Sequence, residues 1–197
     1  TSIIRRYFYN HTDDNEQSTI GAMFLQKFID YTDDTRVQLQ FWDTAGQERY
    51  KALVPMYVKG ANIVLIAYDI TNTQSFESID RWVGFLLNLQ NVKIVLISNK
   101  NDLAHKKVIS NVMGQRKADE IDAQFFDVSA KENTNINKLF DYIIETGKKV
   151  SKSYPQEEDK SIVKIKKLDP DTNLLKNFTD TAGEYIDSVS NKCCSIQ

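Results

Sequence analysis

Two short apolar runs without alternation constrain the fold of this chain more than any other feature. They span residues 63–68 and 94–97 and consist almost entirely of aliphatic residues. A strand with one solvated face alternates apolar and polar side chains, whereas a strand covered on both faces reads as a continuous apolar run. The two runs therefore predict inner strands of a parallel sheet.

Helical patterns lie between and after these strands. One apolar stripe at helical spacing consists of Phe76, Ile79, Val83 and Leu86, and a second consists of Ile136, Leu139, Phe140, Ile143 and Ile144. The same spacing predicts a short helix at residues 2–9, and residues 124–128 are expected to form a last strand. Strands that alternate with helices predict an α/β fold with a mostly parallel sheet.

Residues 23–29 and 36–42 are expected to pair as a hairpin. In the second segment Val37, Leu39 and Phe41 alternate with Gln38, Gln40 and Trp42. The Thr-Asp-Asp sequence at residues 32–34 supplies the turn between the two strands.

Composition excludes several classes of protein. The net charge of −2 over 197 residues argues against nucleic-acid binding, which usually requires a basic face. No apolar run approaches the roughly 18 residues of a membrane span. Cys193 and Cys194 are the only cysteines, so the body of the chain fits a reducing compartment. Apolar residues become sparse after residue 151, which predicts a folded domain at 1–150 and a flexible tail at 151–197.

The strongest local motif is Asp-Thr-Ala-Gly-Gln-Glu at residues 43–48, directly after a predicted strand. Asp43 at a strand end can reach Mg²⁺ through water. Gly46 lets the backbone approach a phosphate and donate its N–H group, and Gln47 can orient an attacking water. The alternative is an ordinary strand-to-helix turn that uses small residues, and for Asp43 alone that alternative is favoured.

Two further motifs follow predicted strands. Asn-Lys-Asn-Asp at residues 99–102 places a carboxylate where it can accept both N–H groups on one edge of guanine, and a solvated turn is the alternative. Ser-Ala-Lys at residues 129–131 can back the base with main-chain N–H groups, but taken alone this motif favours the alternative of a helix N-cap at Ser129. Thr19, in the loop before the hairpin, offers a hydroxyl to Mg²⁺ or serves only as a strand-entry residue.

The order of these motifs is more specific than any one of them. Each lies at or beside a strand end, and ligands of open α/β sheets bind at the carboxyl ends of the strands. In this order the motifs resemble those of Ras-like GTPases. Tyr-Asp-Ile-Thr at residues 68–71 and Tyr-Val-Lys-Gly-Ala at 57–61 are similar to Rab proteins. Ser-Thr-Ile-Gly-Ala at 18–22 and Val-Pro-Met-Tyr at 54–57 are most similar to the early-endosomal branch.

The resemblance implies a Ras-like P-loop GTPase fold, a GTP/GDP site with Mg²⁺, and slow GTP hydrolysis that an activating protein accelerates. Gln47 would position the catalytic water. Metal binding would involve Thr1, Thr19 and Asp43. Nucleotide contacts would come from Thr1, Ser18, Thr19, Gly46, Asn99, Lys100, Asp102, Ser129, Ala130 and Lys131. Effectors would dock on Phe24, Trp42 and Tyr57, for which core packing is the alternative.

The chain departs from the family pattern in two places. Thr12 stands where family members usually carry an aromatic residue that packs against the guanine. The chain also opens at the position of the Ser/Thr that follows the lysine of the phosphate loop, so the first strand and that loop are missing from it. Because the family places its first strand in the middle of the sheet, two inner strand edges are expected to remain unpaired, and the chain alone is expected to be inactive.

The end of the tail resembles a Rab prenylation signal at Cys193 and Cys194. The resemblance implies a vesicle-traffic switch on the cytosolic face of endosomal membranes, with exchange factor, activating protein, GDP-dissociation inhibitor, prenyltransferase and effectors as partners. The alternative function is a Rab-like interaction module that keeps the fold without holding nucleotide.

Overall fold

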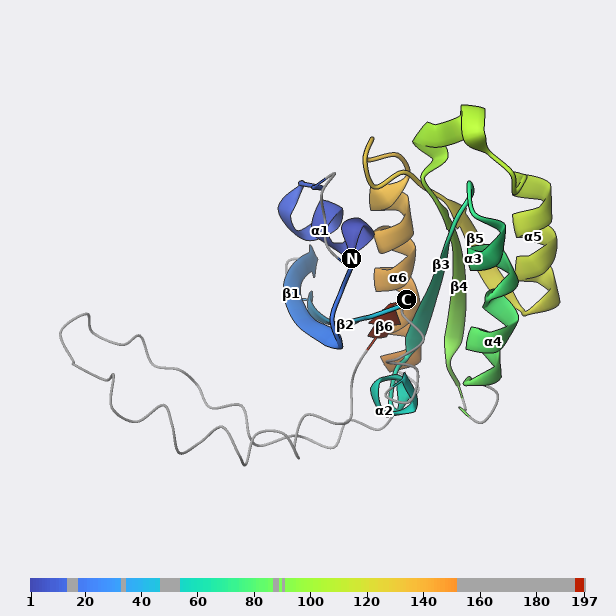
Figure 1. Cartoon of the computed structure of the whole chain (residues 1–197). Coiled ribbons are helices and arrows are strands. Elements are labelled where there is room, and N and C mark those ends of the chain that lie inside the picture. Colours follow the sequence, from blue (N-terminus) through green and yellow to red (C-terminus); the bar gives the residue numbers. More distant parts are fainter. Residues whose placement is uncertain are drawn as a thin grey trace.

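A sheet with the strand order β1-β2-β6-β3-β4-β5 forms the centre of the structure (Figure 1). The structure is a computed structural model that describes residues 1–13, 18–32, 35–46, 54–86, 89, 91–151 and 194–196. The strands are β1 (Ala22–Thr32), β2 (Thr35–Thr44), β3 (Ile63–Asp69), β4 (Lys93–Asn99), β5 (Ala123–Asp127) and β6 (Cys194–Ile196). Among the strands that the structure describes, only β1 and β2 pair antiparallel, so the predicted α/β fold with a mostly parallel sheet is confirmed.

Helices cover both faces of this sheet (Figure 1). They are α1 (Ser2–Tyr9), α2 (Val54–Val58), α3 (Thr73–Glu77), α4 (Ile79–Gly84), α5 (Asn111–Glu120) and α6 (Ile136–Ser151), and a 3₁₀ helix, η2 (Asn101–Lys106), follows β4. Helices α1 and α6 lie on one face, and α3, α4 and α5 lie on the other. The carboxyl ends of β3 and β4 are thereby left open to a set of loops.

The two covered faces explain the continuous apolar run of β3. Ile63 and Leu65 belong to the core under α1 and α6, whereas Val64 and Ile66 belong to the core on the opposite face. Successive strand side chains point to opposite faces, so a strand between two helical layers needs an apolar residue at every position. The predicted inner strands are confirmed for both runs.

The predicted hairpin is also confirmed, and it is longer than the alternating pattern indicated. Strands β1 and β2 pair from Ala22 with Thr44 to Thr32 with Thr35. Residues 33 and 34 of the predicted turn lie outside the described part.

One predicted helical stripe is divided between two short helices. Ser78 separates α3 from α4, and its hydroxyl donates to the carbonyl of Ser75 at 2.8 Å. A serine that bonds a carbonyl in the preceding turn competes with the regular helical hydrogen bonds. The inward direction of the stripe still holds, because Ile79 is fully buried and Phe76 packs against the same core.

Helix α5 has no counterpart among the predicted helices, because its buried face consists of small residues. Gly114 and Ala118 are its buried positions, and a Cβ atom at Gly114 would lie 2.3 Å from Tyr68 Oη and 2.8 Å from the Phe125 ring. A large apolar stripe would not fit at so short a helix–sheet distance. The signal that does mark this helix is Ser110, whose hydroxyl accepts from the N–H group of Met113.

Strand β6 is the main difference from the predicted organisation, which had no strand in the tail. It lies between β2 and β3 and runs parallel to both, with Ser195 opposite Trp42 on one side and Val64 on the other. The unpaired backbone groups of two inner strand edges provide a ready template for a further strand. Residues 194–196 thus fill the gap that the sequence predicted in the middle of the sheet.

Candidate functional site

The loops that follow the neighbouring parallel strands β4 and β5 are hydrogen-bonded to each other. The Ser129 hydroxyl donates to Asp102 Oδ1 at 2.6 Å, and the Ala130 N–H group donates to Asn99 Oδ1 at 3.3 Å. Ser129 is fully buried, so its hydrogen bond holds the Asp102 carboxylate in one orientation. Two motifs separated by about thirty residues of sequence therefore form one polar site, with the second Asp102 oxygen left for a ligand.

The backbone around Lys100 is adapted to this site. Lys100 has a φ of 67°, a left-handed conformation that non-glycine residues rarely adopt. Asn101 secures the bend, since its side-chain amide donates to the carbonyl oxygens of Ser98 and Val128, both at 3.2 Å. The sequence singled out Asn101 only as part of the motif at residues 99–102. In the structure its side chain joins the loop after β4 to the loop after β5.

Asp69, at the end of β3, is a member of the site that the sequence did not single out. Lys100 Nζ lies 2.8 Å from Asp69 Oδ2, and Thr71 donates to Asp69 Oδ1 through both its N–H group and its hydroxyl. Partial burial raises the pKa of Asp69, but the hydrogen bonds from Lys100 and Thr71 outweigh it and the pKa is lowered overall. The position of Asp69 at the end of an inner strand was the available signal.

The three predicted metal-binding residues lie close together at the N-terminal end of α1. The Thr1 hydroxyl is hydrogen-bonded to the Thr19 hydroxyl, and the Thr1 α-amino group lies 3.2 Å from Asp43 Oδ1. Asp43 is 1% exposed, and among the described residues its Oδ2 has no hydrogen-bond partner. A buried orphan carboxylate oxygen beside two hydroxyls fits Mg²⁺, which takes oxygen ligands and completes its shell with water and substrate phosphate.

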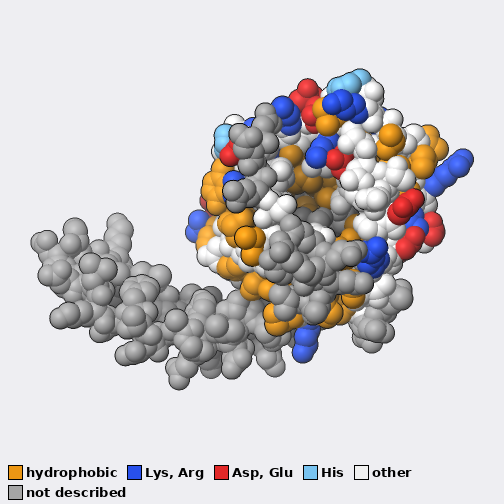
Figure 2. Space-filling model, in the orientation of Figure 1, with side chains coloured by type: hydrophobic (Ala, Val, Ile, Leu, Met, Phe, Trp, Pro, Cys, Tyr) orange, Lys and Arg blue, Asp and Glu red, His pale blue; other side chains and the backbone are white. Residues whose placement is uncertain are grey.

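Two further predicted nucleotide contacts lie next to the hairpin strands. Ser18 and Gly46 are both exposed, in the loop before β1 and just after β2 respectively. Gln47 lies outside the described residues, so its predicted catalytic function stays a prediction. Figure 2 shows charged side chains of both signs at the upper edge of the domain, where the loops after β3 and β4 lie.

Phe24, Trp42 and Tyr57 form one aromatic cluster. Trp42 lies between the other two rings, with centroid distances of 5.1 Å to Phe24 and 5.3 Å to Tyr57. Phe24 is 39% exposed, so the cluster reaches the surface and is not simply part of the core.

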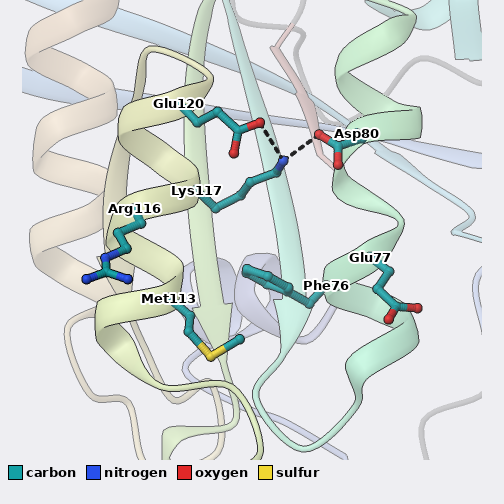
Figure 3. Close-up of a pocket in the computed structure, with 7 residues that line it drawn as sticks. All are labelled: Phe76, Glu77, Asp80, Met113, Arg116, Lys117 and Glu120. Atoms are coloured by element: carbon teal, nitrogen blue, oxygen red, sulfur yellow. Dashed lines mark hydrogen bonds and ion pairs between the residues drawn. The ribbon is translucent and has the colours of Figure 1, made fainter.

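A groove of about 340 Å³ lies on the opposite side of the domain from α1 and α6, between α3–α4 and α5 (Figure 3). Lys117 on α5 reaches across it to Asp80 on α4 at 2.6 Å and also pairs with Glu120 on its own helix at 3.1 Å. Desolvation lowers the pKa of Lys117, but its two carboxylate partners outweigh that effect and the pKa is raised overall. None of the predicted nucleotide or metal residues lines this groove.

A comparison with protein families decides the identity of the fold and site. The sequence matches the Ras family over residues 1–149. The chain belongs to the Ras family. It is therefore a small GTPase switch, of a family whose members in general bind GTP or GDP with Mg²⁺. The match ends close to the predicted domain boundary at residue 150.

Proposed function

We propose that this Ras-family protein is a Rab-type switch that regulates vesicle traffic at endosomal membranes. The observation that carries the proposal is the aromatic cluster of Phe24, Trp42 and Tyr57, which joins β1, β2 and α2 into one partly exposed surface. Aromatic side chains that are clustered and partly exposed are the usual anchors of protein interfaces. Phe24 lies on β1 after Thr19, and Trp42 directly precedes Asp43 on β2, so a partner bound to the cluster is sensitive to the state of the nucleotide at the proposed Mg²⁺ site.

The chemistry that we propose is in-line attack of water on the γ-phosphate of GTP. Asp102 accepts hydrogen bonds from the guanine edge while Ser129 holds its other oxygen, and Asn99 braces the loop behind the base. Thr19 and the Gly46 N–H group hold the γ-phosphate, and Gln47 orients the water. Thr1, Thr19 and Asp43 would hold Mg²⁺, which when bound would neutralise charge on the β- and γ-phosphates. Loss of the γ-phosphate releases Thr19 and Gly46, so the two loops that contain these residues relax.

Membrane attachment is proposed to use prenyl groups on Cys193 and Cys194. Within the described residues no helix is long and apolar enough to cross a bilayer. Two lipid chains give durable attachment, whereas one chain gives only marginal binding. Because Cys194 begins β6, this proposal requires residues 194–196 to leave the sheet before the prenyltransferase can act.

Ras-family proteins in general work with exchange factors, activating proteins and effectors. For this chain we propose in addition a GDP-dissociation inhibitor that extracts the prenylated, GDP-bound protein from membranes. This partner would cycle the protein between cytosol and endosomes.

Extraction from liposomes tests the Rab-type proposal. The protein, expressed from its complete coding sequence and prenylated, is loaded with GDP or with a non-hydrolysable GTP analogue and mixed with a GDP-dissociation inhibitor. We expect the inhibitor to release the GDP form and to leave the GTP-analogue form bound. Replacement of both Cys193 and Cys194 by Ser should move the protein to the soluble fraction from the start. Equal extraction of the two nucleotide forms, or membrane binding that persists in the double variant, would contradict the proposal.

A further inference from the structure

Arg6 joins the end of α1 to the loop that follows β5. Its Nε donates to the carbonyl oxygen of Ala130 at 2.7 Å, and its Nη2 donates to the carbonyl oxygen of Lys131 at 2.8 Å. The same guanidinium also contacts residues that follow it closely in the sequence. Its Nη1 donates to the Asn10 carbonyl at 2.8 Å, and its Nη2 donates to the Thr12 hydroxyl at 3.0 Å. One guanidinium therefore fixes two successive peptide groups that lie about 125 residues away in the sequence.

Holding a carbonyl oxygen also aims the N–H group of the same peptide. The described peptides are all trans, and in a trans peptide the C=O and N–H bonds point in opposite directions. When Arg6 holds the Ala130 oxygen, the Lys131 N–H group points away from α1. When Arg6 holds the Lys131 oxygen, the Glu132 N–H group points away in the same manner.

The Glu132 N–H group continues the chain of contacts to the base-reading carboxylate. It donates to Ser129 Oγ at 3.0 Å, and Ser129 Oγ donates to Asp102 Oδ1 at 2.6 Å. Because Ser129 Oγ accepts from Glu132, its own proton is directed to Asp102. Arg6 is thus linked to Asp102 through one peptide group and one hydroxyl.

We propose that Arg6 is a positioning residue that sets the preference of this site for guanine. It does so by aiming the Lys131 N–H group and by orienting Asp102 through Glu132 and Ser129. The proposal rests on the assignment of the loops at 99–102 and 129–131 as the base site. It also accounts for the position of Thr12 beside this loop, since Thr12 and Lys131 accept from the same Arg6 nitrogen.

The geometry requires arginine at this position. All acceptors described for Arg6 are neutral oxygens, so the contact is a fork of directed hydrogen bonds and not an ion pair. Lysine would keep the charge, but its single ammonium group has no rigid fork that could hold two carbonyl groups in a fixed relative orientation. Arg6→Lys is therefore expected to behave more like Arg6→Ala than like the parent.

The affinity ratio for GDP and inosine diphosphate tests the proposal. Inosine lacks the exocyclic amine that a correctly oriented Asp102 accepts from, and a hydrogen bond to a charged group is worth about 10- to 100-fold. In the protein expressed from its complete coding sequence, we expect Arg6→Ala and Arg6→Lys to reduce the GDP-to-inosine-diphosphate ratio roughly tenfold. Amide hydrogen exchange at Glu132 should accelerate in both variants, with or without nucleotide.

The controls separate positioning from general stability. Arg116→Ala removes an exposed guanidinium from α5 and should change neither the ratio nor the exchange at Glu132. If Arg6→Ala does not fold, Arg6→Gln keeps a shorter polar side chain without the guanidinium fork and gives the same two readouts. A parental protein without preference for GDP would overturn the base-site assignment itself. A parental preference that survives in the Arg6 variants, or an equal loss for both nucleotides, would overturn the function of Arg6.

Discussion

Two lysine–aspartate pairs, one at the base site and one in the α4–α5 groove, have similar distances and different surroundings. Lys100 lies 2.8 Å from Asp69, and Lys117 lies 2.6 Å from Asp80. At the base site the carboxylate is the less exposed partner, with 21% of its side chain exposed against 53% for the lysine. In the groove the lysine is 12% exposed and the aspartate is 67% exposed.

The difference reflects what each pair stabilises. Asp69 is the last residue of β3, and Lys100 directly follows β4. At this edge of the sheet a left-handed residue and several hydrogen bonds from side chains to the backbone replace regular structure. Lys117 and Asp80 belong to helices that would keep their backbone hydrogen bonds without the pair. Irregular loops held by polar contacts can present side chains to a ligand, whereas the groove contacts mainly join two helices. Ligand affinity should therefore depend on the first region, and only stability should depend on the second.

The largest expected effect is that of Asp102→Asn on nucleotide choice. An amide cannot accept from both guanine donors, and loss of charge-assisted hydrogen bonds should weaken GDP binding by about 10²-fold or more. Binding of xanthosine diphosphate should improve, because the altered base edge matches the amide. Competition binding in the protein expressed from its complete coding sequence measures both.

Asp80→Asn is the matched control for that change, since it makes the same replacement in the groove. It should leave the affinities for GDP and xanthosine diphosphate unchanged. Equal effects of the two variants on GDP would remove the distinction between the two regions.

A smaller effect is expected for Gly114→Ala, which tests how closely α5 packs on the sheet. The new methyl group would meet Tyr68 Oη at 2.3 Å and the Phe125 ring at 2.8 Å. Overpacking of this kind costs about 1–3 kcal/mol, from which the better helix propensity of alanine recovers up to about 1 kcal/mol. Denaturant unfolding should show a net loss of stability, with GDP affinity unchanged.

Gly147→Ala in α6 provides the opposite expectation. Among the described residues nothing lies within 4 Å of a Cβ atom at Gly147, so only the gain in helix propensity remains and stability should rise. If both alanine variants changed stability in the same direction, the close approach at Gly114 would not be the cause.

The smallest expected effects are opposite shifts in the pH dependence of stability. The pKa of Lys117 is raised above 10.5, so its contribution is complete below that pH and is lost as pH rises through the folded value. The pKa of Asp69 is lowered below 3.8, so its contribution is present above that pH and is lost as pH falls through the folded value. Each contribution should be below about 1 kcal/mol, because exposed partners are screened by solvent.

The free energy of unfolding of Lys117→Met and Asp69→Asn, measured against pH without nucleotide, separates the alkaline loss of stability from the acid loss. Lys117→Met should flatten only the alkaline loss of stability, and Asp69→Asn only the acid loss. A variant that altered both the acid and the alkaline loss of stability would show that the two regions are coupled.

The elements that the sequence predicted correctly are those with a pattern contained in a few neighbouring residues. The continuous run of β3 and the five-residue stripe of α6 require only that each side chain be assigned to a face. The alternating β2 was found for the same reason. The reasoning failed at Ser78, which divides a predicted helix, and at Gly114, which lies on a helix that was not predicted. The spacing of apolar residues does not report a competing hydroxyl hydrogen bond or a close helix–sheet contact.

By itself the sequence also predicted which residue types would meet nucleotide, since the motifs at 43–48, 99–102 and 129–131 are local and their order is specific. Only the tertiary structure decided what joins them. The contact of Arg6 with Ala130 spans 124 positions, and the place of β6 between β2 and β3 depends on two open strand edges. A local pattern reports which face a side chain occupies, whereas contacts between distant segments exist only after the sheet has brought its strand ends together.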